Sequence, residues 1–193
     1  MWNSGEPALP DKLRQATENL CDDLTALGPK QDDAEQLADV LIGSGAIGML
    51  VPEADGGLGG AWADLISATT QVGRASGSAA WLMTEYAGNA ALLGVMDESV
   101  QQEIKTADPR VALALQGETT LVESSDDSVM VSGRWRSIPG ALRAEWVLLM
   151  IQDAKAGDLF ACVPRAALGS TSITHLGGLR GVGFEDLEAN NLE

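Results

Sequence analysis

The hydrophobic pattern of this chain changes its period near Pro109, and this change limits the fold more than any other feature. Before it, apolar residues recur at the three- and four-residue spacing of amphipathic helices. After it, short runs rich in Val, Leu, Thr and Trp are separated by clusters of Gly, Asp and Ser, which is typical of strands and turns. The sequence therefore predicts an α+β fold with a helical domain at 1–108 and a β-domain at 109–193.

Helices are expected throughout the first region. A leucine stripe from Leu9 to Leu27 predicts a first helix that stops at Gly28-Pro29, because glycine and proline end helices. A second helix starts near Asp32 or Asp33 and finishes around Gly43 to Gly45. The others are a third helix through Trp62 to Val72, a fourth capped by Ser78, and a short one capped by Asp97. The fourth is apolar on most sides, which predicts burial on more than one face.

The second region is expected to be a β-region built of strands and turns. Asp126-Asp127 is a predicted hairpin turn between the second and the third strand. The predicted strands are Val111–Gln116, Thr119–Glu123, Ser128–Gly133, Glu145–Gln152, Leu159–Pro164, Ser172–His175 and Glu185–Asn190.

The composition is that of a globular protein with an acidic surface. Hydrophobic residues make up 45% of the 193 residues and charged residues 21%, which disfavours disorder. The net charge of −16 argues against binding to nucleic acid or to an anionic membrane. With no signal peptide and no apolar run of about 18 residues, we expect a soluble, cytoplasmic protein.

Cysteine and histidine give no sign of a metal site. Cys21 and Cys162 lack the C-x-x-C spacing and are interpreted as buried thiols. His175 is the sole histidine, and no metal-ligand cluster or Ser-His-Asp triad is visible around it.

The segment Gly48–Gly60, which reads G-M-L-V-P-E-A-D-G-G-L-G-G, is the most informative local motif. Pro52 ends a short apolar run, and the glycines permit left-handed turns and close backbone approach. Phosphate-binding loops are also rich in glycine, but neither G-x-x-x-x-G-K-[ST] nor a strand-borne G-x-G-x-x-G is present.

Three motifs together resemble the acyl-CoA dehydrogenase superfamily. The segment Gly48–Gly60 resembles its "x-x-P-E-x-x-G-G-x-G" loop. Val131–Gly140, followed by Ala144–Leu149, resembles its middle β-domain, most of all in the two-component flavin monooxygenases. Gly178–Gly183 resembles the "G-L-R-G-T-G" turn late in the same domain. The three matches come in the family's order and span most of the chain.

The resemblance implies a helical bundle followed by a small antiparallel β-barrel or sandwich. In the family, the flavin ring lies between the middle β-domain and a following C-terminal helical bundle. Here the sequence ends at Glu193, where that bundle would begin, so no residue inherits the family's glutamate base and the catalytic residues stay unknown. A partner chain would then complete the enzyme, as a homo- or hetero-oligomer.

The resemblance also implies that this chain supplies one wall of a binding site for FAD or FMN. Arg136, Ser137 and Ile138 correspond to the family's "W-I-T" or "F-A-S" segment beside the flavin, and Gln116 falls near the end of a strand that also contacts it. Trp135 is either a core anchor or a flavin contact, and packing is the favoured interpretation.

Three functions stay open at this point. The first is a component of a flavin-dependent oxidoreductase, which dehydrogenates an acyl thioester or hydroxylates a small molecule. The second is a flavin-free descendant with binding or non-redox chemistry, such as cyclisation or dehydration. Gln116, Arg136 and Pro139 favour it because they depart from the family pattern. The third is a non-catalytic structural subunit.

Other polar residues are interpreted as structural. Arg180 is expected to bind backbone carbonyls at a turn, and Glu53 and Asp55 are expected to cap the loop or to face solvent. Glu85 and Asn89 lie near one face of the fourth helix, where packing is favoured over contact with a substrate.

Overall fold

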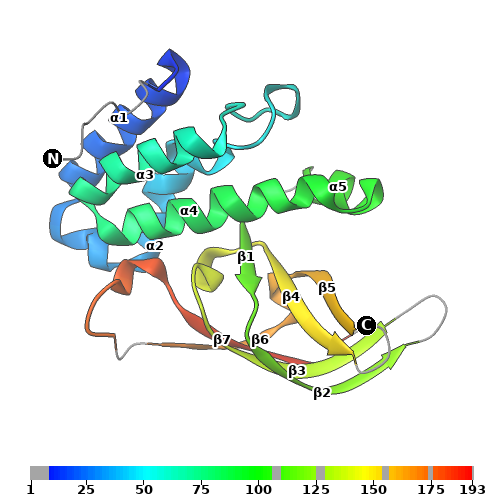
Figure 1. The fold of residues 1–193 in the computed structure, drawn as a ribbon. Coiled ribbons are helices and arrows are strands. Elements are labelled where there is room, and N and C mark those ends of the chain that lie inside the picture. Colours follow the sequence, from blue (N-terminus) through cyan, green and yellow to red (C-terminus); the bar gives the residue numbers. More distant parts are fainter. Residues whose placement is uncertain (1–8, 106–109, 125–128, 154–156, 174–175, 193) are drawn as a thin grey trace, which may run out of the picture.

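The computed structural model describes residues 9–105, 110–124, 129–153, 157–173 and 176–192. Helices come first and sheets second, so the predicted α+β fold is confirmed (Figure 1). Within the described ranges, no helix combines the length and the apolar character needed to cross a bilayer. The helices are α1 (Asp11–Leu27), α2 (Ala34–Gly43), α3 (Trp62–Ala75), α4 (Gly77–Leu92) and α5 (Glu98–Lys105).

Local signals set the ends of the helices. Gly28 adopts φ 57° directly after α1, and Pro29 follows it. Asp33 caps α2, since its carboxylate accepts the backbone N–H groups of Glu35 and Gln36. The bond from the Gln36 backbone is the main reason why the pKa of Asp33 is lowered. The predicted cap of α4 was wrong by two residues, because the hydroxyl of Ser76, and not of Ser78, accepts the N–H of Ala79.

Helix α4 lies between α3 and the strands (Figure 1). It packs against α3 on one side and against β1 (Val111–Ala114) and the short 3-10 helix η7 (Arg180–Val182) on another. Two buried polar side chains attach α4 to the β-region, which is the part of the chain from β1 onward. The hydroxyl of Tyr86 donates to the carbonyl of Gly140 at 2.7 Å, and the amide of Asn89 donates to the carbonyl of Val111 at 3.0 Å. Asn89 therefore has the structural role that the sequence favoured.

The strands form two sheets. One has the order β1, β4 (Trp146–Asp153), β5 (Gly157–Pro164). The other has the order β2 (Gly117–Ser124), β3 (Val129–Ile138), β7 (Glu185–Leu192), β6 (Gly169–Ser172). All pairs are antiparallel except β1 and β4, which run parallel with Val111 opposite Trp146. The expectation of a wholly antiparallel domain thus misses one pairing.

The observed strand bounds differ from the predicted ones at several ends. β3 extends to Ile138, five residues beyond its predicted end, and β1 ends at Ala114, before its predicted end at Gln116. The strand predicted at Ser172–His175 was misplaced, because β6 occupies Gly169–Ser172 and all four of its residues are exposed. The predicted turn at Asp126-Asp127 and the histidine His175 lie outside the described residues.

Candidate functional site

The candidate flavin wall is a corner where the chain passes from one sheet to the other. β1 ends at Ala114 and β2 begins at Gly117, so Leu115 and Gln116 connect the two sheets. Gly117 pairs with Trp135 in the antiparallel register, which places Gln116 next to Arg136. Gln116 and Arg136 are exposed, and Leu115 is 46% exposed. The structure thus brings together residues that lie about twenty positions apart in the sequence.

Ser137 has an unusual backbone in this corner. Its φ is 55°, a left-handed conformation that side chains other than glycine rarely adopt. The register between β3 and β7 shifts between Trp135 and Ile138, and the backbone N–H of Ser137 donates to the carboxylate of Asp186 at 2.8 Å. The irregularity leaves the side chain of Ser137 exposed at the end of the strand. Strained residues of this kind cluster at functional sites.

Two of the predicted wall residues lie beneath this surface. Trp135 has no exposed area, and its indole N–H donates to the carbonyl of Met150 at 3.0 Å. Gly117 permits this packing, because a Cβ there would lie 2.3 Å from the indole ring. Ile138 is 3% exposed. Trp135 is thus a core anchor, as favoured from the sequence, and the flavin contacts of the corner remain a prediction.

A groove runs beside the corner. It has a volume of about 450 Å³ and is lined by residues of β3, β6 and β7, among them Arg134, Arg136 and Asp186. Arg134 pairs with Glu188 at 3.1 Å. Arg136 has no hydrogen-bond or ion-pair partner in the part of the chain that the structure describes, which leaves its guanidinium available to an anionic ligand.

Charged groups near the corner form ion pairs that hold structural elements together. Glu185 is 3% exposed and pairs with Arg165, and the hydroxyl of Ser172 lies 3.2 Å from its carboxylate. Because a buried carboxylate needs such partners, these contacts hold β7 against β6. The prediction for Arg180 was wrong, since this residue pairs with the carboxylate of Asp32 and thereby connects the β-region to the helices.

The other sequence predictions concern Glu53 and the two cysteines. Glu53 pairs with Lys12 at 3.1 Å at the surface, which fits its solvated interpretation. The side chains of Cys21 and Cys162 are half-buried rather than fully buried. Burial raises the pKa of the Cys21 thiol. Asp186 belongs to the corner, and nothing in the sequence pattern indicated it. Among the described residues, no group of three or more His, Cys, Asp or Glu could hold a metal ion.

The exposed side chains of the corner include both apolar and polar groups. They combine the apolar surface of Leu115 with the amide of Gln116, the guanidinium of Arg136 and the hydroxyl of Ser137. Planar cofactors need such a mixture of apolar contact and a few placed polar groups. The backbone contributes less, because Asp186 occupies the N–H of Ser137 and Pro139 has none.

The architecture is that of the N-terminal helical and middle β-domains of the acyl-CoA dehydrogenase superfamily, as the sequence motifs indicated. The HsaA monooxygenase from M. tuberculosis superposes on 96% of this chain with a TM-score of 0.82 at 21% identity. A glutaryl-CoA dehydrogenase from Mycobacterium smegmatis, in complex with FADH2, covers 98% with a TM-score of 0.78 at 13% identity. No family model matches the sequence.

A curated relative agrees with these structures. The oxygenase component of the FADH(2)-dependent resorcinol hydroxylase from Rhizobium sp. (strain MTP-10005) is 26% identical over 147 residues. The match covers 73% of this chain and 36% of the relative. The chain likewise spans 53% of the HsaA monooxygenase and 55% of the glutaryl-CoA dehydrogenase. The chain is thus homologous to part of a flavin-dependent oxygenase component.

Proposed function

We propose that this chain is part of a flavin-dependent monooxygenase that hydroxylates a small aromatic molecule. The observation that carries the proposal is the exposed corner at Gln116, Arg136 and Ser137, on a fold that matches flavin enzymes over nearly all of its length. The curated relative is an FADH(2)-dependent hydroxylase component, which favours hydroxylation over dehydrogenation of an acyl thioester.

The exposed residues of the corner have distinct roles in this proposal. Gln116 and Ser137 hydrogen-bond the polar edge of the ring, and Leu115 excludes water from its face. Arg136 holds an anionic part of the cofactor, since its guanidinium has no partner in the described part of the chain. When bound, a reduced flavin supplies the two electrons with which one oxygen atom of O2 enters the substrate and the other leaves as water.

The remainder of the site comes from further polypeptide in this proposal. The chain spans about half the length of the enzymes with which it superposes. Its helical domain (1–108) and β-domain (109–193) form two sides of the site, and an additional domain or partner chain, in a homo- or hetero-oligomer, closes the third. FAD and FMN both remain candidates for the cofactor.

A flavin titration tests the proposal. We expect FAD or FMN, reduced under anaerobic conditions, to bind the purified chain, as measured by calorimetry. Replacing Arg136 by alanine should weaken binding by about tenfold, the effect of losing one charged hydrogen bond. Arg14→Ala is the matched control, because it removes the same charge from α1, where Arg14 pairs with Asp11 and Glu18. Equal binding by Arg136→Ala and the control would contradict the assignment of Arg136.

The second candidate is the flavin-free scaffold. It is favoured by the hydrogen bond from the Ser137 N–H to Asp186 and by the missing N–H of Pro139, because both remove backbone donors from the wall. If neither flavin binds in either redox state and a non-flavin small molecule protects Arg136 from chemical modification, this second function is supported and the first is rejected.

A further inference from the structure

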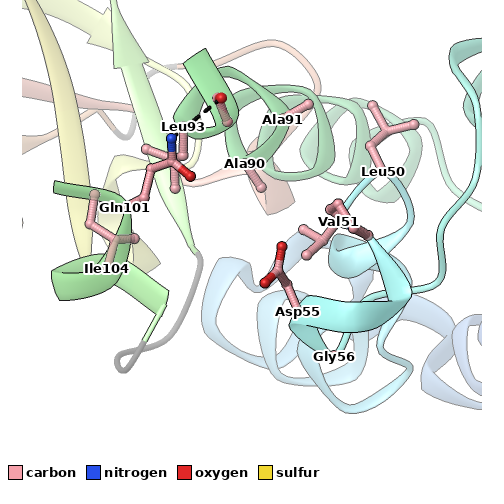
Figure 2. A pocket seen from close by; sticks show the side chains of 11 residues that line it. Leu50, Val51, Asp55, Gly56, Ala90, Ala91, Leu93, Gln101 and Ile104 are labelled. Carbon is pink, nitrogen blue, oxygen red and sulfur yellow. Dashed lines mark hydrogen bonds between the residues drawn. The ribbon is translucent and has the colours of Figure 1, made fainter. Parts of the chain in front are cut away.

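A second cavity lies away from the flavin corner. It has a volume of about 510 Å³, which is in the range of small-molecule sites. Figure 2 shows it between the segment Gly48–Gly60 on one side and the end of α4 with α5 on the other. Its apolar lining includes Leu50, Val51, Ala91 and Ile104. Neither the flavin corner nor the groove beside it shares a residue with this cavity.

The first wall of the cavity is a rigid loop. Backbone N–H groups of Gly57 and Gly59 donate to the carbonyls of Pro52 and Val51, at 3.1 Å and 2.9 Å. A Cβ on Gly57 would lie 2.2 Å from the carbonyl oxygen of Val51, and Gly56 adopts φ 85°. Glycine is therefore required at both positions. These constraints fix Val51 and Asp55 in place before any ligand binds.

The second wall is fixed by Gln101 of α5. Its amide nitrogen donates to the carbonyl of Met96 at 2.7 Å and to the carbonyl of Gly94 at 3.4 Å, and Figure 2 shows the second bond. Both hydrogens of the amide are thus used, and its oxygen remains as an acceptor. Helix α4 ends at Leu92 beside the cavity, so the negative end of its dipole lies there too.

The polar side chains among the lining residues supply acceptors. Asp55 points into the cavity in Figure 2, and Gln101 lies across from it. Asp55 makes a further interaction within the protein, and a carboxylate with two oxygens can accept an additional donor. The net charge of −16 attracts cations and repels anions. A ligand that fits needs an apolar body and a positively charged hydrogen-bond donor.

We infer that this cavity is a binding site for a small hydrophobic amine, whose ammonium group donates to Asp55 and whose apolar body packs against Leu50, Val51 and Ala91. The glycine-rich segment serves as the preformed wall of this site. The inference is independent of flavin binding, because the two sites use different residues.

Three probes with the same phenylethyl body and different charge test the inference by calorimetry. Phenethylamine is a cation at neutral pH, 2-phenylethanol is neutral, and 3-phenylpropanoate is an anion. We expect phenethylamine to bind at least about tenfold more tightly than the alcohol, because a charge-assisted hydrogen bond is the stronger one. The anion should not bind. Similar affinity for all three, or binding of none, would overturn the inference.

Variants identify the site. Asp55→Asn should weaken phenethylamine binding by about tenfold or more. Asp23→Asn is the matched control, since Asp23 is an exposed residue of α1 outside the cavity. Ala91→Leu should abolish binding by filling the cavity, with an unchanged circular dichroism spectrum as the measure of folding. Unchanged affinity in Asp55→Asn and in Ala91→Leu would place the amine elsewhere and refute the site.

Discussion

The helical region and the β-region differ in which residues adopt backbone conformations with positive φ. In the described part of the helical region, every residue with positive φ is a glycine, namely Gly28, Gly45, Gly56 and Gly59. In the β-region, Ser137, Leu179 and Asn191 adopt positive φ without being glycine. A left-handed conformation costs such residues about 1–2 kcal/mol each. The helical region thus avoids backbone strain, and the β-region retains it.

This difference in backbone strain distinguishes the loop of the helical region from the candidate site in the β-region. In the helical region, glycine makes a tight loop possible and a rigid cavity wall results. In the β-region, one strained residue, Ser137, lies in the corner that we assign to the flavin. Strain that folding does not require persists where the surrounding structure enforces it, as Asp186 does through its bond to the Ser137 N–H.

The largest effect is expected where the helical region has no space for an added side chain. Gly57→Ala would place a Cβ 2.2 Å from the carbonyl oxygen of Val51 and 2.4 Å from its Cβ. Since the obstacle includes backbone, the loop must shift, and we expect the free energy of unfolding to fall by about 3 kcal/mol. Urea denaturation measures this loss.

Gly43→Ala is the matched control for this loop. Gly43 is the last residue of α2 and has no positive φ, and a Cβ added to it would meet no atom within 4 Å. Alanine there should stabilise the protein by up to about 1 kcal/mol. If both substitutions change the free energy of unfolding equally, the requirement for glycine at position 57 is refuted.

The elements of the fold were predictable where neighbouring residues in the sequence determine them. Asp33 caps α2 and Gly28-Pro29 ends α1 because the responsible groups are neighbours in sequence. Strand β6 was misplaced because its four exposed residues show no alternation of apolar and polar positions. The parallel pairing of β1 with β4 joins segments 35 positions apart, and no local pattern encodes it.

The candidate site was predictable only in part for the same reason. The resemblance led to Gln116, Arg136 and Ser137, and the register of β2 against β3 brings them together. Asp186 was missed because its bond to Ser137 spans 49 positions. The partner of Arg180 was likewise unpredictable, since Asp32 is 148 positions away.

A smaller effect, of opposite sign, is expected from the strain in the β-region. Ser137→Gly removes the unfavourable contact of a Cβ at φ 55°. We expect stabilisation by about 0.5–1 kcal/mol, measured by urea denaturation. Ser170→Gly in the exposed strand β6 is the control, and it should destabilise by a similar amount because glycine weakens a regular strand. A loss of stability in Ser137→Gly would show that the conformation is not strained.

The smallest effect concerns a cost in the helical region that is electrostatic rather than conformational. Burial raises the pKa of Glu85 on α4, although the indole N–H of Trp81 donates to its carboxylate at 3.0 Å. An acid with a raised pKa in the folded state destabilises the fold once it is ionised, and the penalty disappears as pH falls below the unfolded-state value. Glu85→Gln should therefore raise the melting temperature at pH 7.

The pH dependence distinguishes this cause from a change in packing. The gain from Glu85→Gln should shrink as the pH falls toward 4, because the native carboxyl is then protonated and resembles the amide. Glu118→Gln is the control, since Glu118 is exposed on β2. Its melting temperature should follow the wild-type curve throughout. A gain from Glu85→Gln that is constant between pH 4 and pH 7 would assign the effect to packing, and the helical region would then be free of both kinds of cost.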